Sequence, residues 1–230
     1  MFKKYWKFFV IFWSVVLVGI IGVFVFFWLI SAGKLGFMPT FEELENPNNR
    51  FASEVYFADG PIMNRYFEKE NRKYIEYREI PQSVIDALIA TEDVRFYDHS
   101  GVDVRGLFRV AKGLLTANTS AGGGSTISQQ LAKMLFPRES DLNVFELAIR
   151  KFREWVIAVR LEKSYTKEEI LTMYLNKYDF LNLAVGISSA ADIYFQVPLD
   201  SLKVEQAAML IGMAKNSSYY NPVRRPELTL

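Results

Sequence analysis

The chain has 230 residues, with 27 Lys and Arg against 26 Asp and Glu, a single His and no Cys. The lack of cysteine excludes disulfides and thiolate ligands, and with only one histidine it argues against a structural zinc site. Setting aside Lys3, Lys4 and Lys7 leaves 24 basic against 26 acidic residues, a net charge of −2, so the balance does not favour nucleic acid as a partner.

The first predicted element is a membrane anchor. Phe8 to Ile30 runs 23 residues without a charge, which at about 1.5 Å per residue spans a hydrocarbon core of about 30 Å. A cleaved signal peptide is the alternative, but its apolar region is only about 7 to 15 residues long. The lysines before the segment, and Glu42, Glu43 and Glu45 after it, place residues 1–7 in the cytoplasm and the rest outside.

Residues 31–74 are predicted to form a connector that contains a β-hairpin. Pro, Asn and Gly interrupt any long period between residues 33 and 50. The stretch SEVYFADGPIMNRYF alternates aromatic and β-forming residues around Asp59-Gly60, a dipeptide typical of hairpin turns.

From Pro81 onward the pattern is helical, which predicts one mainly α domain from about residue 75. Val84, Ile85, Leu88 and Ile89 share one helical face. A helix is also predicted from Val144 to Glu162, with an apolar stripe of Phe145, Ala148, Phe152, Trp155, Val156 and Val159. Further helices are predicted to start at Thr166, in a capping box with Glu169, and to cover Val204 to Ala214.

The stretch TEDVRFYDHSG, residues 91–101, holds three acids, two aromatics and the single histidine. Steps of four from Val84 through Leu88 reach Glu92, so its carboxylate continues the apolar face and is expected in the interior or in a cleft. Desolvation there favours the protonated form and suits the group to accept a proton near neutral pH. An ion pair with Arg95 is an equally good account of this position.

Two later stretches add candidate anion contacts. Arg105, Arg109 and Lys112 share one helical face, a pattern most often found on solvated surface. The run AGGGSTISQQLAK, residues 121–133, places three glycines before Ser125, a suitable N-cap. Backbone N–H groups at a helix start favour anions, although the run is not a P-loop and a linker is the alternative.

A second carboxylate, Glu154, lies in RKFRE beside Arg150, Lys151 and Arg153. These cations are expected to keep it ionised. Glu92 and Glu154 then form two acids in opposite environments, a pattern typical of sugar chemistry, although both acids could be structural.

Four stretches, in this order, resemble one known family: ATEDVRFYDHSGVDVRGLFR, GGSTISQQLAK, RKFREWVIAVRLEKSYTKEEILTMYLN and EQAAMLIGMAKNSSYYNPVRRPE. This family is the peptidoglycan glycosyltransferases, found as monofunctional enzymes and as the first domain of class A penicillin-binding proteins. The resemblance covers residues 75–226. It implies a mainly α, lysozyme-like domain over residues 75–230 that polymerises lipid II into β-1,4-linked glycan strands. The anomeric carbon would be inverted and undecaprenyl pyrophosphate released.

The resemblance also implies roles for individual residues. Glu92 would be the base that deprotonates the acceptor sugar's 4-hydroxyl, Glu154 the second essential carboxylate, and Asp93 a substrate contact that orients the site. The residues implied to receive the donor pyrophosphate are Arg109, Lys133 and Arg150. Other implied substrate-binding residues are Arg95, Gln129, Gln130 and Lys151, and implied structural residues are His99, Gly101, Ser125 and Thr126. His99 is expected to be a hydrogen-bonding pin for the turn that ends at Gly101.

The resemblance further implies partners and a location. A divalent cation, Mg²⁺ or Mn²⁺, would accompany the pyrophosphate, with Glu154 as its candidate ligand, and no organic cofactor is expected. Lipid II, the growing glycan chain, the membrane and the cell-wall synthesis machinery are the implied partners. The protein would be a single-pass protein of the bacterial cytoplasmic membrane, with its catalytic domain outside.

Two departures from the family pattern stand out. After Tyr174-Leu175-Asn176 the family usually carries Tyr-Phe-Gly-x-Gly, whereas this chain has KYDFLNLAVG. The chain also ends before the family's last arginine-containing helix and is expected to be a fragment. The alternative functions are a lysozyme-like or lytic peptidoglycan hydrolase and a non-catalytic lipid II-binding module. The anchor, the cationic cluster and the second carboxylate favour the polymerising enzyme.

Overall fold

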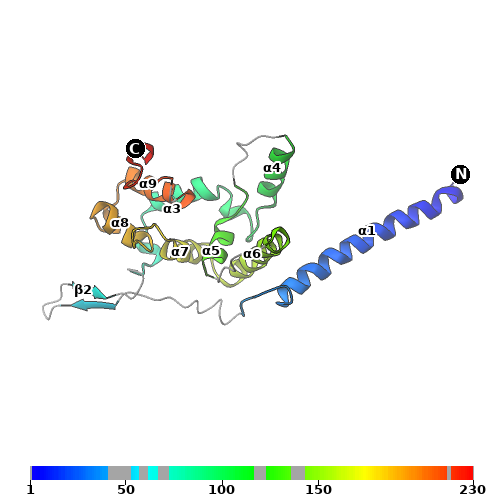
Figure 1. Ribbon diagram of the computed structural model, residues 1–230, viewed down its shortest axis with the longest axis horizontal. Coiled ribbons are helices and arrows are strands. Elements are labelled where there is room, and N and C mark those ends of the chain that lie inside the picture. Colours follow the sequence, from blue (N-terminus) through cyan, green and yellow to red (C-terminus); the bar gives the residue numbers. More distant parts are fainter. Residues whose placement is uncertain are drawn as a thin grey trace.

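A long apolar helix and a helical body make up most of the structure. The computed structural model describes residues 2–40, 53–56, 62–66, 73–116, 123–135, 143–216 and 219–229. The long helix projects from one side of the body, and a small two-stranded sheet lies on the other (Figure 1). The predicted mainly α fold with an N-terminal apolar helix and a short hairpin is confirmed.

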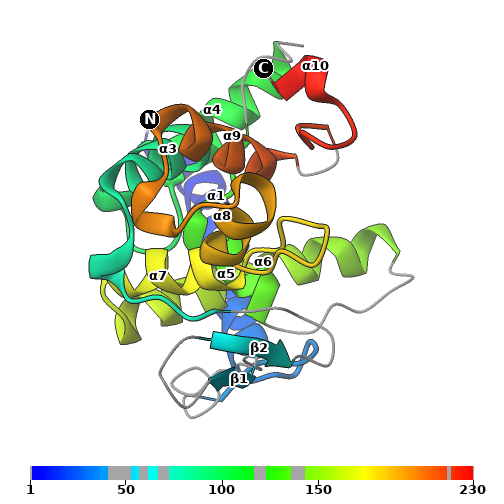
Figure 2. The ribbon, with the colours of Figure 1, turned by 90° about the vertical axis from the view of Figure 1, so that its left-hand side faces the viewer.

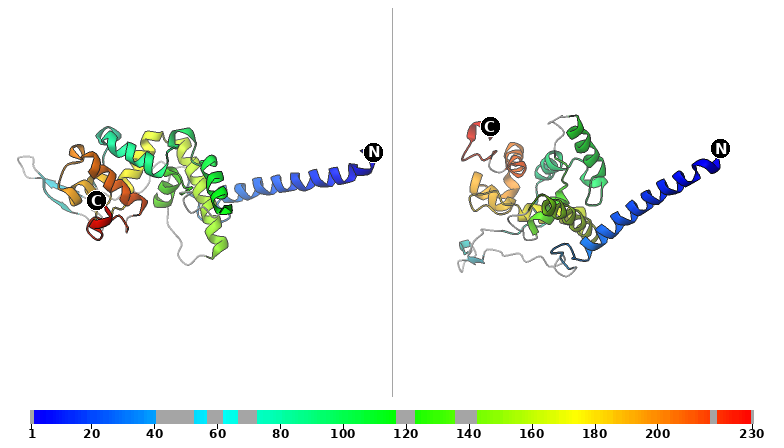
Figure 3. Two further views of the ribbon diagram at one scale, coloured as in Figure 1. Left: turned by 90° about the horizontal axis from the view of Figure 1, so that it is seen from above. Right: turned by 45° about the vertical axis from the view of Figure 1, so that its right-hand side comes forward.

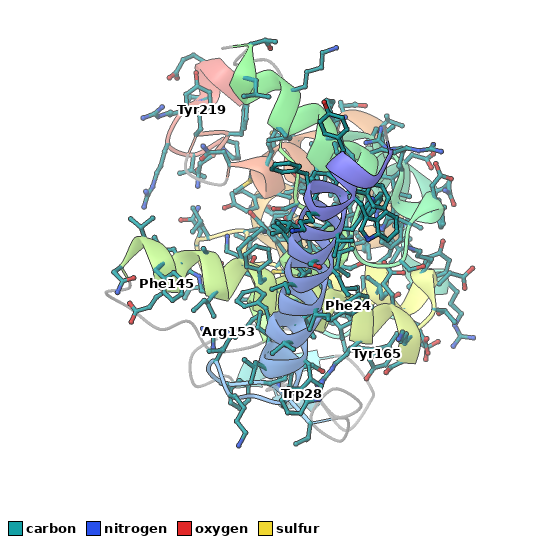
Figure 4. The ribbon with its side chains drawn as sticks, turned by 90° about the vertical axis from the view of Figure 1, so that its right-hand side faces the viewer. Phe24, Trp28, Phe145, Arg153, Tyr165 and Tyr219 are labelled. Atoms are coloured by element: carbon teal, nitrogen blue, oxygen red, sulfur yellow. The ribbon has the colours of Figure 1, made fainter. Side chains whose placement is uncertain are left out.

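Helix α1, Phe2–Ser31, contains the predicted membrane segment. Tyr5–Ser31 is long and apolar enough to cross a membrane, by length and composition. Large apolar side chains face outward along it, among them Phe24 and Trp28, which are 72% and 65% exposed (Figure 4). Removing apolar surface from water is favourable by about 25 cal/mol per Å², so an apolar surrounding stabilises α1 more than water does.

The end of α1 is held by α6, Val144–Ser164. The Phe152 ring meets the Phe26 ring edge to face, with 5.4 Å between centroids. The Arg160 guanidinium donates to the Ser31 carbonyl at 2.9 Å, which satisfies one of the unpaired carbonyls at the end of a helix.

The apolar stripe predicted for α6 is not the side of the helix that packs into the body. Phe145 is 71% exposed and lies at the end of α6 farthest from α1 (Figure 4), while Phe152 and Trp155 are only half-buried. The buried residues of α6 are Arg153, Glu154, Ile157, Ala158 and Leu161. α6 packs against α5 on one side and against the end of α1 on another, and Phe152 of the stripe contacts Phe26 of α1.

The body is built from packed helices (Figures 2 and 3). α3 packs against α9, and α5 packs against both α6 and α7. Their bounds are α3 Gln82–Glu92, α5 Ile127–Leu135, α7 Lys167–Lys177 and α9 Val204–Lys215. Also described are α4 Val104–Leu115, α8 Ile187–Phe195 and α10 Pro226–Thr229, and the short 3-10 turns Tyr77–Glu79, Phe96–Asp98 and Leu199–Ser201.

One hydrophobic core joins α3, α5, α6, α7, α8 and α9. Val84, Ile85 and Leu88 of α3 are buried, as their shared face predicts, and Ile89 is half-buried. The largest fully buried side chains are Tyr174, Phe96, Phe180, Ile30, Ile85, Leu88, Ile127, Leu131, Leu161, Ile170 and Leu171. Truncating such a side chain to alanine typically costs about 2–5 kcal/mol.

Capping boxes fix where α6 and α7 begin. The Thr166 hydroxyl accepts from the Glu169 N–H at 3.2 Å, and the Glu169 carboxylate accepts from the Thr166 N–H at 2.7 Å, which confirms the predicted start of α7. Asn143 and Glu146 make the same exchange at the start of α6. Each box satisfies N–H groups that the first helical turn leaves unpaired.

The predicted hairpin is present as strands β1 Ser53–Tyr56 and β2 Ile62–Tyr66. They pair antiparallel, with Ser53 opposite Tyr66. The predicted Asp59-Gly60 turn lies outside the described residues. The domain boundary at residue 75 stays a prediction.

The loop after α7 has an unusual backbone. Leu181, Asn182 and Leu183 have φ of 64°, 50° and 67°, and each left-handed non-glycine residue costs roughly 1–2 kcal/mol. The Asp179 carboxylate accepts from the Leu181 N–H at 2.8 Å and supports this turn. The loop therefore adopts a left-handed backbone at three consecutive residues, none of which is glycine.

Candidate active site

A polar cleft of about 480 Å³ opens between α3, α5, α6 and the end of α9. Two carboxylates and three lysines lie along it, so its formal charge is cationic. The lining residues are Glu92, Ser125, Gln129, Gln130, Lys133, Met134, Lys151, Glu154, Tyr178, Ala214, Lys215 and Asn216. The structure thus brings together both predicted catalytic carboxylates with Ser125, Gln129, Gln130, Lys133 and Lys151. Such a set of groups suits a substrate that carries both hydroxyls and phosphates.

Glu92 is the last residue of α3 and is half-buried. Its Oε2 accepts from Gln130 Nε2 at 2.5 Å, while its Oε1 is shielded and has no partner among the described residues. Arg95 pairs with Asp103, so the alternative of a Glu92–Arg95 ion pair is wrong. A buried acceptor without a partner costs about 1–3 kcal/mol, and in a native fold such a group calls for a functional explanation.

The amide of Gln130 makes a second hydrogen bond, on the side away from Glu92. The Tyr174 hydroxyl lies 3.0 Å from Gln130 Oε1 and donates to it. Tyr174 belongs to the core and is fully buried. Burial, together with the nearby Glu92 charge, raises the pKa of Tyr174. The hydroxyl therefore keeps its proton at any pH at which the protein works.

Glu154 lies on α6, one turn after Lys151. Lys151 Nζ donates to Glu154 Oε2 at 2.9 Å and to the Ser125 hydroxyl at 2.8 Å. The expected cation beside Glu154 is therefore present. It reaches the carboxylate from the same helix, three residues earlier in the sequence.

The prediction that Ser125 caps α5 is wrong by one residue. Thr126 Oγ1 accepts from the Gln129 N–H at 3.2 Å, and α5 begins at Ile127. Ser125 therefore faces the cleft, where its hydroxyl is bound by Lys151.

Asp93, adjacent to Glu92, belongs to a buried cluster with His99, Gly101 and Thr126, here called the Asp93 cluster. The Asp93 carboxylate accepts from His99 Nε2 at 3.0 Å and from the Ile127 N–H at 3.1 Å. The Gly101 N–H donates to His99 Nδ1 at 3.3 Å, so the ring proton lies on Nε2. Asp93 does not line the cleft, and substrate contact by its side chain stays a prediction.

The Asp93 cluster is joined to α6 through Gly101. Thr126 Oγ1 donates to the Gly101 carbonyl at 2.7 Å, and Gly101 has a φ of 95°. A Cβ at this position would lie 2.8 Å from the backbone of Ala158. Only glycine fits such a close approach with positive φ. The cluster therefore fixes the loop before α4 against the helix that carries Glu154.

Besides Asp93, three other predicted substrate contacts lie away from the cleft. Arg109 is exposed on α4 and donates to the Gly123 carbonyl at 3.3 Å, and Arg150 is half-buried on α6. Arg95 lies at a second hollow, of about 630 Å³, in an ion pair with Asp103. Burial opposes the charge of Asp103, but hydrogen bonds from Arg95 and from the Gly106 backbone outweigh it and lower the pKa of Asp103.

Lys215, Asn216 and Tyr178 line the cleft but were not predicted as site residues. Lys215 ends α9, a place where a lysine is usually explained by the helix dipole. Nothing in the local pattern indicates that this helix end lines the same cleft as α5 and α6. The motif EQAAMLIGMAKNSSYYNP was the only signal, since it contains Lys215 and Asn216.

The donor set does not by itself fit a resident metal ion. Among the described residues no group of three or more His, Asp or Glu side chains is placed to hold one. Glu154 offers one carboxylate, and Lys151 already donates to its Oε2. Mg²⁺ sites built from so few carboxylates take further ligands from substrate phosphates and water. A metal requirement therefore stays a prediction.

Comparison with known proteins agrees with these motifs. A family model described as transglycosylase matches residues 59–230. Penicillin-binding protein 1A of Neisseria lactamica is 37% identical over 190 residues, 83% of this chain and 23% of that protein. Proteins of the same name are 37% identical over 186 residues in Escherichia coli strain K12, and 38% identical over 189 residues in Pseudomonas aeruginosa. These two alignments cover 81% and 82% of this chain, and the chain spans less than a quarter of each relative.

Proposed function

Because this chain belongs to the transglycosylase family, we propose that it is a membrane-anchored peptidoglycan glycosyltransferase that polymerises lipid II into β-1,4-linked glycan strands. The observation that carries the proposal is the Glu92 carboxylate, which has one oxygen held by Gln130 and the other without a partner. It lies in the same cleft as three lysines and the lysine-bound Glu154.

In the proposed reaction Glu92 is the general base. It accepts the proton of the acceptor sugar's 4-hydroxyl as that oxygen attacks the anomeric carbon of the growing chain. The new C–O bond forms on the face opposite the leaving group, the bond to the pyrophosphate oxygen breaks, and the carbon is inverted. A positioned base of this kind contributes roughly 10²- to 10⁴-fold in rate.

The lysines of the cleft are proposed to stabilise the departing undecaprenyl pyrophosphate. Lys133, Lys151 and Lys215 come from α5, α6 and α9, so they surround the cleft from different sides. Charge that develops on a leaving group is stabilised most by cations already in place. Glu154 would orient Lys151 through their 2.9 Å contact. Contacts from Arg109 and Arg150 would require the substrate to extend beyond the cleft-lining residues.

We further propose that α1 holds the enzyme at the surface where its substrate lies. Lipid II has an undecaprenyl tail, so an anchored enzyme and its substrate share one bilayer. Residues 1–7, which contain three lysines, would lie in the cytoplasm and the body outside. The growing glycan and the cell-wall synthesis machinery would be partners on that outer side.

The test is a polymerisation assay on the full chain in detergent with labelled lipid II, with and without Mg²⁺. Wild type is expected to form polymer that a muramidase digests, and Glu92→Gln is expected to lower the rate by about 10²-fold or more. Glu205→Gln, which changes an exposed acid of α9 outside the cleft, is the matched control.

Each other outcome points elsewhere. Equal polymer from wild type and Glu92→Gln would remove Glu92 as the base. Digestion of preformed glycan would establish the hydrolase, and binding of lipid II without turnover by wild type would establish the binding module.

A further inference from the structure

We propose that Tyr174 is a positioning residue for Glu92 and acts on it through the amide of Gln130. This inference rests on the proposed function, in which Glu92 is the base. Tyr174 is fully buried in α7 and is not among the residues that line the cleft. Its hydroxyl is nevertheless only two hydrogen bonds away from the Glu92 carboxylate, through Gln130.

The direction of this chain of hydrogen bonds follows from its two ends. An ionised Glu92 can only accept, so the Gln130 nitrogen faces it at 2.5 Å. The Gln130 oxygen then faces Tyr174 at 3.0 Å, and the tyrosine must donate. The tyrosine hydroxyl, held in the core, thus anchors the amide in the orientation that the ionised base requires, with a donor and not an acceptor against Glu92.

The rest of the core keeps Tyr174 in place. Its ring stacks on the Tyr178 ring, with 5.6 Å between centroids and 21° between planes. Because a buried ring has few rotamers to choose from, the hydroxyl points in a fixed direction. Gln130 is longer and only half-buried, so without the hydroxyl its amide could turn its oxygen toward Glu92. That orientation would disfavour the ionised base.

The proposed role predicts a change in the pH dependence of activity, to which other charged groups of the cleft also contribute. Lys133 on α5, Lys151 and Glu154 on α6, and Lys215 at the end of α9 line the same cleft as Glu92. Substituting Tyr174 by phenylalanine changes none of these charges and removes a single oxygen atom. A shift in the pH profile would therefore report on the hydrogen-bonded chain.

The experiment compares Tyr174→Phe with wild type in the lipid II assay on the full chain, as a function of pH. We expect kcat to fall about 3- to 10-fold, as for loss of one hydrogen bond, with KM changed less than about twofold. We expect the acid limb of the kcat/KM profile to move up by about 0.5 to 1 pH unit. Tyr194→Phe, which removes a hydroxyl bonded to the Phe180 carbonyl outside the cleft, should leave the profile unchanged.

A double-mutant cycle tests the route through Gln130. In a Gln130→Leu background the Tyr174→Phe change should alter kcat by less than about twofold, because coupled residues are not additive. Independent, multiplicative losses or an unmoved acid limb would overturn the proposal. Failure of wild type itself to make polymer would instead overturn the proposed function, so the two failures are distinguishable. Thermal denaturation of each variant separates loss of folding from loss of turnover.

Discussion

Glu92 and Asp93 are neighbours in the chain, yet their carboxylates meet opposite surroundings. Both oxygens of Asp93 lie within hydrogen-bond distance of His99 Nε2, at 3.2 and 3.0 Å, and one also accepts from the Ile127 N–H. Glu92 lines the cleft and leaves one oxygen without a partner among the described residues. The helix ends between them, because Asp93 leaves the helical region with φ −157° and ψ 74°.

The difference between the two acids separates stability from chemistry. A carboxylate whose partners are all in place stabilises the fold and has no capacity left for a substrate. A carboxylate with an unpaired oxygen lowers the stability of the fold, and a hydrogen bond from a bound substrate offsets that cost. Asp93 is therefore expected to matter for folding, and Glu92 for turnover.

Removing Asp93 tests this separation with the largest expected effect on stability. Asp93→Ala leaves the His99 ring and the Ile127 N–H without their acceptor, so the free energy of unfolding should fall by about 2–4 kcal/mol. Thermal denaturation in detergent measures this, and Glu92→Gln should change stability by less than about 1 kcal/mol. Asp98→Ala, at an exposed acid in the same stretch, is the control. Full stability with lost activity in Asp93→Ala would show that Asp93 acts on substrate.

Adding one methyl group at Gly101 tests how tightly the Asp93 cluster is pressed against α6. In Gly101→Ala the new Cβ would lie 2.8 Å from the Ala158 backbone, and the residue has a positive φ. The free energy of unfolding should therefore fall by about 1–3 kcal/mol. Gly212→Ala is the matched control, because nothing lies within 4 Å of a Cβ there. In the interior of α9 that change should stabilise by about 0.5–1 kcal/mol. Equal effects of both substitutions would contradict the close packing of Gly101.

Substituting a third acid of the same region, Asp103, should have the smallest effect on stability, and this effect should be confined to acid pH. Its pKa in the folded protein is lowered chiefly by the hydrogen bond from Arg95. The pair therefore stabilises the fold above the unfolded value of about 3.9 and loses this contribution as the pH falls through the folded pKa. Unfolding measured from pH 5 downward should show a shallower decline for Asp103→Asn than for wild type. Parallel curves would mean that the ion pair does not stabilise the fold.

Much of the fold follows from local patterns. The long apolar N-terminal helix, the start of α7 at Thr166 and the buried face of α3 were predicted from apolar spacing and capping residues, and the structure confirms them. The apolar stripe predicted on α6 is not its buried side, because α6 packs against both α5 and α1 and has no single apolar face. Periodicity can detect an apolar side but does not tell which neighbour covers it.

The sequence by itself determined which residues could do the chemistry. Helix phase singled out Glu92, the cations of RKFRE marked Glu154, and the order of the motifs indicated the family. Each of these signals is local, since helix phase and neighbouring charges act over a few residues.

Only the tertiary structure decided how these residues divide their roles. It buried Asp93 against His99, placed Lys215 in the cleft and left Arg109 outside it. It also connected Tyr174 to Glu92 through Gln130, across 44 and 38 positions of the chain. Hydrogen bonds between helices depend on how those helices pack, which no local pattern encodes.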